Sequence, residues 1–397
     1  MHKAMSSGQN KQGIKVLISG SVLQLFFGII YMWSVFAAPV SEQLGWAMDK
    51  VKLTSSFMLS FFVIGILAGG RLLPRIGAQK VTLMGGLMLA AGMCAAAFVP
   101  GNAPWLIYGA YGVVGGFGVG LAYNAVISCA QKWFLKNRGF ATGVSVCAFG
   151  FSTVVFAPLA EWMIGKFGLK LAFLTLSGVF ASAALALFNS IALPSEAAAT
   201  PTAAQSAQKQ YTLKQALATR EFYLITFSLM LGTAAFFTLN PSFKTLAAER
   251  NLSASAGTGL VMLTGVANAL GRLGVPLLSD KIGRRWGALL TLAVTAACTG
   301  LLVFTRSYAF MGMVALIAFC YGGYSGIYPV LTADCFGIRN VGSNYGGVML
   351  GFSLSALLVP VSIGLISDIT VKFVVLAALA ALGAALIGMM MTGRKKQ

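Results

Sequence analysis

Charged side chains are scarce in this sequence, and acidic ones are scarcest. Of the 397 residues only 9% are charged, whereas 58% are hydrophobic. A soluble domain carries about 25% charged residues. The mean hydropathy is +0.83. This composition excludes a soluble globular protein and indicates a polytopic membrane protein that partners the lipid bilayer.

Histidine and paired cysteines are also missing. The only histidine is His2, in a polar tail, and the six cysteines show no paired spacing. A histidine-based metal site, a catalytic triad and a disulfide framework are therefore excluded. We expect no cofactor, no metal and no enzymatic activity, because no acid–base constellation exists. The net charge of +19 comes from short basic runs between apolar segments, which indicates loops facing anionic lipid and not nucleic-acid binding.

Twelve apolar segments are long enough to cross a bilayer, which takes about 20 residues each. The first is predicted at 14–40 and the last at 371–391. If both termini are cytoplasmic, 19 of the 28 Lys and Arg residues lie on the cytoplasmic side, and this bias sets the orientation. We therefore predict an all-α protein of the plasma (inner) membrane, acting as a monomer.

The chain is predicted to consist of two similar halves. A segment rich in Ala, Gln, Ser and Thr at 194–219 is interpreted as a flexible cytoplasmic linker between six-helix bundles at 1–193 and 220–397. Three residue pairs recur at a spacing of 202: Pro39 and Pro241, Phe134 and Phe336, Pro158 and Pro360. The loops at 72–80 (LLPRIGAQK) and 277–285 (LLSDKIGRR) also match. Parallel repeats of this kind place a substrate site at their interface, near the bilayer midplane.

Arg272 is the one charged residue that cannot be placed near the end of a predicted span. A guanidinium inside a spanning helix costs about 2.5–3.5 kcal/mol, so it should face a polar cavity or a partner. Its planar fork suits a carboxylate or a phosphate. The alternative is a structural role, pairing with a carbonyl or reaching toward Asp280. Glu161 and Asp334 lie at span ends, where we expect them to be solvated.

Several motifs carry a family resemblance. Ser279-Asp280-Lys281-Ile282-Gly283-Arg284-Arg285 is similar to the signature loop of the major facilitator superfamily, in which an acid and arginines clamp one state of an alternating-access cycle. The resemblance implies that Asp280, Arg284 and Arg285 act in gating. The first-half copy departs from the pattern, with Pro74 in place of the acid and Ala78-Gln79 in place of the arginines.

Within that superfamily the chain resembles the oxalate/formate antiporter family, which neighbours the monocarboxylate transporters. The resemblance rests on Tyr31-Met32-Trp33-Ser34-Val35-Phe36, Gly118-Val119-Gly120 with Lys132-Trp133-Phe134 and Arg138-Gly139, Asp334-Cys335-Phe336-Gly337, and Asn344-Tyr345-Gly346. It implies that Arg272 is the substrate arginine. It further implies cavity positions at Tyr31, Tyr123, Phe149, Tyr321 and Ser325. Phe352 stands where the oxalate carrier has a lysine.

Two asparagines complete the candidate substrate site. Asn268 lies one helical turn before Arg272 on the same face, where monocarboxylate transporters have a titratable aspartate. It is interpreted as a cavity hydrogen-bonder or a packing amide. Asn124, beside Tyr123, points about 100° away from it, so one of the pair can face packing.

The sequence thus predicts a secondary active transporter of a small carboxylate. One fixed positive charge matches one carboxylate, which favours monocarboxylates such as lactate, pyruvate and formate. An oxalate/formate-type exchanger and a non-transporting carboxylate receptor are the alternatives. A proton or a counter-anion is the candidate coupling partner, so symport and antiport both stay open.

Overall fold

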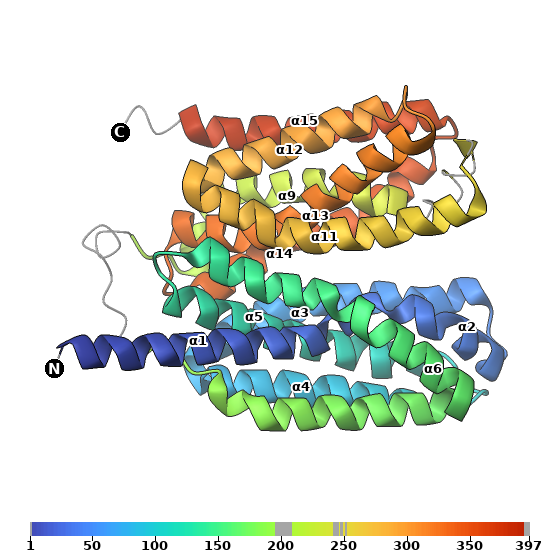
Figure 1. The fold of residues 1–397 in the computed structure, drawn as a ribbon, viewed down its shortest axis with the longest axis horizontal. Coiled ribbons are helices and arrows are strands. Elements are labelled where there is room, and N and C mark those ends of the chain that lie inside the picture. Colours follow the sequence, from blue (N-terminus) through green and yellow to red (C-terminus); the bar gives the residue numbers. More distant parts are fainter. Residues whose placement is uncertain (1, 195–208, 241–245, 247–248, 251, 393–397) are drawn as a thin grey trace. The chain divides into compact units, whose positions relative to one another are not determined.

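The computed structural model describes residues 2–194, 209–240, 246, 249–250 and 252–392 (Figure 1). Helices dominate, and no strand occurs among these residues, in agreement with the all-α prediction. The chain forms two compact units. Unit 1 comprises Met1–Lys136, Ala148–Lys209 and Asn340–Gly346, and unit 2 comprises Asn137–Cys147, Gln210–Arg339 and Gly347–Gln397. The predicted division into halves at 194–219 stays a prediction, and most of that segment lies outside the described residues.

Unit 1 is built around one glycine-rich helix. Its elements are α1 (His2–Phe27), η1 (Gly28–Tyr31), α2 (Trp33–Leu44), α3 (Met48–Ile76), α4 (Ala78–Ala96), η2 (Tyr108–Gly115, a π-helix), α5 (Gly116–Trp133), most of α6 (Arg138–Leu187) and η3 (Phe188–Ser190). Helix α5 packs against α1, α3 and α4. A side chain at Gly120 would collide with the carbonyl of Phe62 on α3, so glycine is what permits this close approach.

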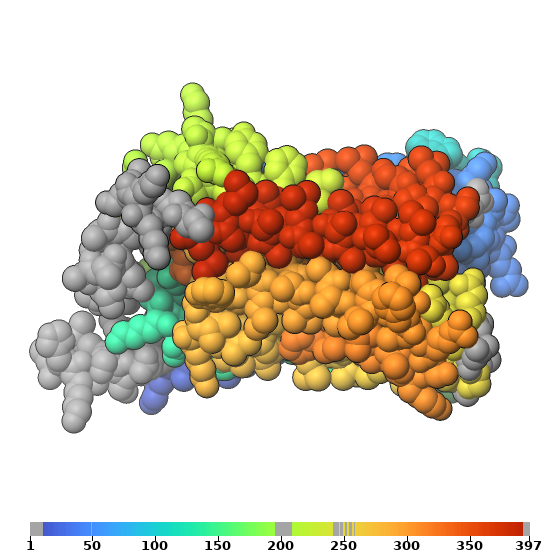
Figure 2. Space-filling view, turned by 90° about the horizontal axis from the view of Figure 1, so that it is seen from above, coloured from blue at the N-terminus to red at the C-terminus, as the bar shows by residue number. Residues whose placement is uncertain are grey.

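Unit 2 contains α8 (Leu213–Leu217), α9 (Arg220–Leu239), α11 (Ala254–Ile282), α12 (Arg284–Leu301), α13 (Ser307–Phe336), most of α14 (Val341–Gly364) and α15 (Ile369–Thr392). Helix α13 packs against α9, α11 and α12. Helices α12 and α15 run side by side along one face, orange beside red in Figure 2. The first turns of α6 belong to this unit as well, since Asn137–Cys147 is part of it.

Ten helical stretches of the described chain are long and apolar enough to cross a membrane. One of them, Arg138–Ser190, has 53 residues, which is more than twice the length of a single crossing. It bends at Gly168, whose φ of 80° and ψ of 166° are not helical. Helix α12, with 18 residues, is not among the ten. The predicted count of twelve spans therefore stays a prediction.

Two helix–helix loops have the same backbone conformation at a glycine. Helix α3 ends at Gly77 (φ 84°, ψ 158°) and helix α11 ends at Gly283 (φ 95°, ψ 145°). In each loop the glycine N–H donates to the carbonyl four residues earlier, Leu73 at 3.1 Å and Ser279 at 3.0 Å. This backbone region is open almost only to glycine. The sequence match between the two loops thus corresponds to one turn conformation. Of the other repeat markers, Pro241 lies outside the described residues.

The described end of the predicted linker is ordered by two contacts with the end of α13. The Tyr211 N–H donates to the Phe336 carbonyl at 2.9 Å, and the Arg339 N–H donates to Gln210 Oε1 at 2.9 Å. A capping box of Thr212 and Gln215 then starts the short helix α8. Residues 210–219 are therefore anchored to unit 2, whereas the sequence predicted a flexible linker over the whole of 194–219.

We predict that Gly283→Ala lowers the free energy of unfolding by about 1–3 kcal/mol, the cost of holding a non-glycine residue in this conformation. The space beside Gly283 is open, so the loss is conformational and not steric. The measurement is unfolding of the purified protein in detergent. Gly265→Ala in α11 is the matched control, because it also faces open space and has helical geometry. Equal stability of the two variants would contradict the role given to the turn.

Candidate functional site

Arg272 lies near the middle of α11 and is 1% exposed. Its Nε donates to Asn268 Oδ1 at 3.1 Å, one turn earlier on the same helix. Its Nη1 lies 3.5 Å from the Val146 carbonyl oxygen, in the segment of α6 that belongs to unit 2. The guanidinium is thus held by neutral oxygens in these two bonds. Neutral dipoles orient the positive charge without cancelling it.

Small residues make this arrangement possible. A side chain at Gly143 of α6 would meet the Arg272 carbonyl oxygen at 3.2 Å, and one at Gly326 of α13 would meet it at 2.6 Å. That carbonyl receives no helical bond from position 276, because Pro276 has no N–H. Glycines on both sides therefore let α6 and α13 approach α11 where Arg272 sits.

The other predicted site residues of unit 2 gather on α13 and α14. The Tyr321 ring stacks on Phe236 with centroids 3.9 Å apart and lies 6.3 Å from Phe352. Phe237 bridges the two at 5.5 Å and 4.9 Å. Ser325 is half-buried one turn after Tyr321, on the same face of α13. Phe352, which is 4% exposed, is thus part of an aromatic wall.

Helix α13 contacts α11 beside Arg272 and also carries Tyr321 of the aromatic wall, which consists of Phe236, Phe237, Tyr321 and Phe352. Gly322 follows Tyr321 directly, and a Cβ there would lie 2.8 Å from Asn268 Oδ1. The same oxygen accepts the Arg272 Nε–H. Arg272, Asn268 and Tyr321 therefore belong to one contiguous region of unit 2, and their contact with substrate stays a prediction.

Unit 1 brings together a second aromatic group. Phe149 is 1% exposed, and its ring lies 5.8 Å from Tyr31 and 5.0 Å from Tyr123. Phe62, which the sequence analysis did not single out, completes the group at 5.2 Å from Tyr123. Tyr31 ends the short helix η1, and it is placed there because Gly28 lies directly against the Phe149 carbonyl. Three of the four residues predicted in this half are thus in contact.

The fourth residue, Asn124, is engaged with neighbouring helices. Its Nδ2 donates to the carbonyls of Ile66 at 2.5 Å and Gly342 at 2.9 Å, and its Oδ1 accepts from Ser128 at 3.2 Å. The side chain is 1% exposed. These bonds fit the packing alternative stated for the Tyr123–Asn124 pair, while its contact with substrate stays a prediction.

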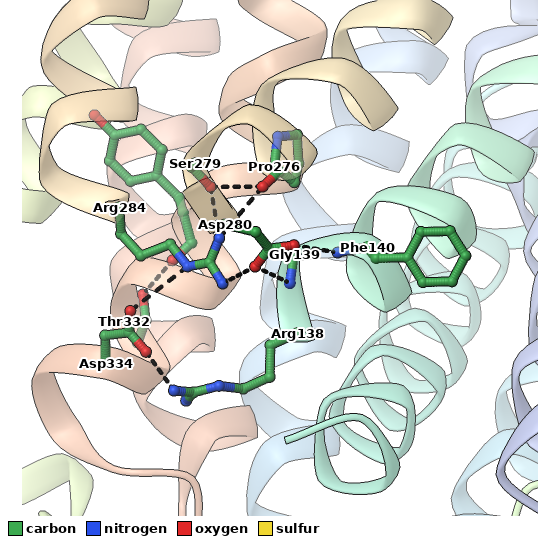
Figure 3. A network of polar contacts seen from close by, with 10 residues as sticks. Arg138, Gly139, Phe140, Pro276, Ser279, Asp280, Arg284, Thr332 and Asp334 are labelled. Carbon is green, nitrogen blue, oxygen red and sulfur yellow. Dashed lines mark hydrogen bonds and ion pairs between the residues drawn. The ribbon is translucent and has the colours of Figure 1, made fainter. Parts of the chain in front are cut away.

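A network of charges surrounds the predicted gating loop (Figure 3). Asp280 forms an ion pair with Arg284 and accepts from the backbone N–H groups of Gly139 at 3.3 Å and Phe140 at 3.0 Å. These amides open α6, so the carboxylate caps the positive end of that helix. Arg284 Nη1 also donates to Ser279 Oγ at 2.7 Å.

Two residues of this network correct or extend the sequence analysis. The expectation that Asp334 is solvated is wrong, because it pairs with Arg138 at 2.6 Å and lies 3.6 Å from Arg284 Nε. Arg138 was not predicted to act there. The family motifs contained both residues, but nothing in a linear sequence indicates that the ends of α6 and α13 meet. Arg285 instead donates to the Met390 carbonyl on α15 at 2.7 Å.

The described residues contain no group of three or more His, Cys, Asp or Glu side chains that could hold a metal ion. The predicted site residues are instead an arginine, an amide, a hydroxyl and aromatic rings in unit 2, and an amide and aromatic rings in unit 1.

The chain belongs to the Major Facilitator Superfamily, whose family model matches residues 18–281 and, again, 225–397. It is therefore a multi-pass transporter of the plasma membrane and not an enzyme, as predicted. An uncharacterised MFS-type transporter of Escherichia coli (strain K12), YhjX, is 24% identical over 86% of this chain and 85% of its own length.

Two further relatives carry transport names. The oxalate:formate antiporter of Oxalobacter formigenes is 26% identical over 80% of this chain and 76% of its own length. Monocarboxylate transporter 13 of Rattus norvegicus is 23% identical, over 87% and 80% respectively. These similarities support the predicted oxalate/formate-related family.

Solved structures show the same fold. The transporter FucP in its outward conformation superposes with a TM-score of 0.72 at 15% identity, covering 95% of this chain and 99% of FucP. The proton:xylose symporter XylE gives a TM-score of 0.68 at 14% identity, covering 96% of each chain. At these identities the likeness concerns the fold alone.

We predict that Arg138→Ala and Asp334→Ala are coupled in a double-mutant cycle of unfolding free energy. The two side chains are 13% and 33% exposed, so solvent screens part of the attraction, and we expect a coupling of about 1 kcal/mol. The control cycle combines Arg138→Ala with Asp368→Ala, which are outside each other's network and should be additive. Additivity of the Arg138 and Asp334 substitutions would show that the ion pair contributes nothing to stability.

Proposed function

We propose that this chain carries small monocarboxylates, such as lactate, pyruvate and formate, across the membrane by alternating access. The observation that carries the proposal is the buried Arg272, oriented by Asn268 and the Val146 carbonyl. These two bonds do not cancel the charge of the guanidinium, and its planar geometry suits a carboxylate. The transport activities for which the oxalate:formate antiporter and the monocarboxylate transporter are named agree with this substrate class.

Charge matching favours one carboxylate over two. Phe352, at the position where the oxalate carrier has a lysine, is buried against Phe237 and Tyr321. An aromatic wall favours the hydrocarbon part of a monocarboxylate. The second charge of oxalate would be left uncompensated in a medium of low dielectric constant. The runner-up function, oxalate/formate exchange, is favoured by the Oxalobacter formigenes relative.

The remaining contacts follow from the side chains that the two units present. Tyr31, Tyr123 and Tyr321 offer hydroxyl donors beside rings, and Phe149 and Ser325 lie next to them in the same groups. Asn124 would contact substrate only by giving up a bond to a neighbouring helix. Asp280, Arg284 and Arg285 are proposed to gate the cycle.

The coupling mode follows from the same charge. A bound carboxylate lowers the cost of burying the Arg272 guanidinium while its site is closed to water, and an empty carrier lacks that contribution. Exchange of one anion for another is therefore favoured over net flux. Symport would require a proton that travels with the substrate or on another group, because Asn268 cannot titrate.

We predict that Arg272→Ala abolishes saturable uptake of labelled L-lactate, pyruvate and formate into proteoliposomes. Removing one partner of a desolvated charge pair costs about 2–5 kcal/mol, equivalent to about 30-fold or more in substrate affinity. Arg272→Lys should retain part of the uptake, because the charge remains and the fork is lost. Uptake by Arg272→Ala at the wild-type rate would overturn the proposal.

We also predict that Phe352→Lys raises the ratio of oxalate to lactate uptake by about tenfold, because it supplies a second positive charge worth about 1.4 kcal/mol or more at the site. Phe352→Leu is the neutral control and should leave the ratio unchanged. Thermal unfolding of both variants separates altered selectivity from misfolding. Strong oxalate uptake by the wild-type protein would favour the runner-up function instead.

A further inference from the structure

A polar cavity lies in unit 2, away from Arg272. It has a volume of about 310 Å³, within the range of small-ligand pockets. Its walls come from the start of α9 (Thr219, Arg220), the start of α12 (Arg285), the end of α13 (Phe336) and the end of α15 (Met390). None of these residues belongs to the substrate site proposed above.

The position of the cavity along the helices sets its depth in the membrane. The candidate spans begin at Arg220 on α9 and end at Phe336 on α13 and at Met391 on α15. All three span ends therefore meet at the cavity, which places it at the level of the lipid headgroups. Tyr223 and Trp286, which are 47% and 57% exposed, lie within three residues of the lining residues Arg220 and Arg285. Exposed Tyr and Trp side chains are typical of this interface.

The charges of the cavity favour an anion. Arg220 and Arg285 both line it, against a single acid, Glu221. The ion pairs around the gating loop join two aspartates to Arg138 and Arg284, and neither Arg220 nor Arg285 takes part in them; Arg285 attracts Asp334 only at longer range. Glu221 lies in the first turn of α9, where the helix dipole compensates a negative charge. The net charge of +1 matches a headgroup whose net charge is −1, that is, a phosphodiester without an attached cationic amine.

The bond that Arg285 already makes leaves it competent for such a ligand. One guanidinium nitrogen, Nη1, donates to the Met390 carbonyl, which fixes the side chain at the wall. The fork has five N–H donors, so the others remain for phosphate oxygens. A neighbouring cavity of about 370 Å³ shares Arg285 with the first, and its lining includes the ion pair partners Arg284 and Asp334. Its lining also includes Trp286, Leu331 and Met391, which place apolar side chains beside the basic cavity, where acyl chains would run.

We propose that this cavity binds the phosphodiester headgroup of an anionic phospholipid, such as phosphatidylglycerol. Arg220 and Arg285 contact the phosphate, and the apolar rim near Met389 receives the acyl chains. Basic pockets between helix ends are the kind of site in which such headgroups bind. A lipid in this place ties α9, α12, α13 and α15 together at one end.

The test is thermal unfolding of the full chain in nanodiscs of phosphatidylcholine, alone or doped with phosphatidylglycerol or phosphatidylethanolamine. Phosphatidylglycerol should raise the melting temperature of the wild type by about 2 °C or more. Arg220→Ala should lose this increase, and Arg220→Lys should keep most of it, because a lysine also binds phosphate as a point charge. Arg220 is exposed, so its removal does not disturb the core.

Arg306→Ala is the matched control, since Arg306 is also exposed and lies at the opposite end of α13. It should respond to phosphatidylglycerol as the wild type does. An equal response of Arg220→Ala and Arg306→Ala would overturn the site. An equal effect of phosphatidylethanolamine would overturn the charge argument, and an equal effect of inorganic phosphate in undoped nanodiscs would show a site for free phosphate and not for lipid. None of these outcomes depends on which substrate is carried.

Discussion

Burial of the Arg272 guanidinium in an apolar helix is the constraint on which the middle of unit 2 depends. The cost of about 2.5–3.5 kcal/mol for placing it there must be offset by polar partners. Two of its partners are a side-chain amide of its own helix and a backbone carbonyl of α6. Both of these partners are neutral, so these two bonds stabilise the guanidinium without cancelling its positive charge.

The first turns of α6 contact α11 at two places. The Val146 carbonyl accepts from Arg272, and the backbone N–H groups of Gly139 and Phe140 donate to Asp280, two turns further along α11. The two segments therefore run antiparallel, with each charge of α11 placed against the backbone dipoles of opposite sign. Glycines at 139 and 143 allow this approach, since a Cβ at either would press on α11. Proposed substrate binding and proposed gating thus share one pair of helices.

Much of this could be predicted from the sequence, and the limits have physical causes. Composition and spacing predict the helices, and a lone charge in an apolar run identifies Arg272. The repeat between the loops at 72–80 and 277–285 also carries over, as one turn conformation. Tertiary pairings could not be predicted in this way. The position of Asp334 at the end of a predicted helix suggests a solvated side chain. Its ion pairs with Arg138 and Arg284 depend on the tertiary packing of α6, α12 and α13, which the sequence does not show. The aromatic contact of Phe62 with Tyr123 was missed for the same reason.

The loops that end at Gly77 and Gly283 share a backbone conformation but differ in their side-chain contacts. Gly77 and Gly283 adopt nearly the same conformation, because each must reverse the chain within one residue and only glycine can do so. The side chains around them have no such requirement. In the first loop Gln79 Nε2 donates to the Asn189 carbonyl at 2.9 Å, an uncharged contact. In the second loop Asp280 and Arg284 carry an ion pair. The backbone conformation is therefore shared by both copies, and the acidic residue with its ion pair is present in the second copy alone, since the first has Arg75 and Lys80 but no acid.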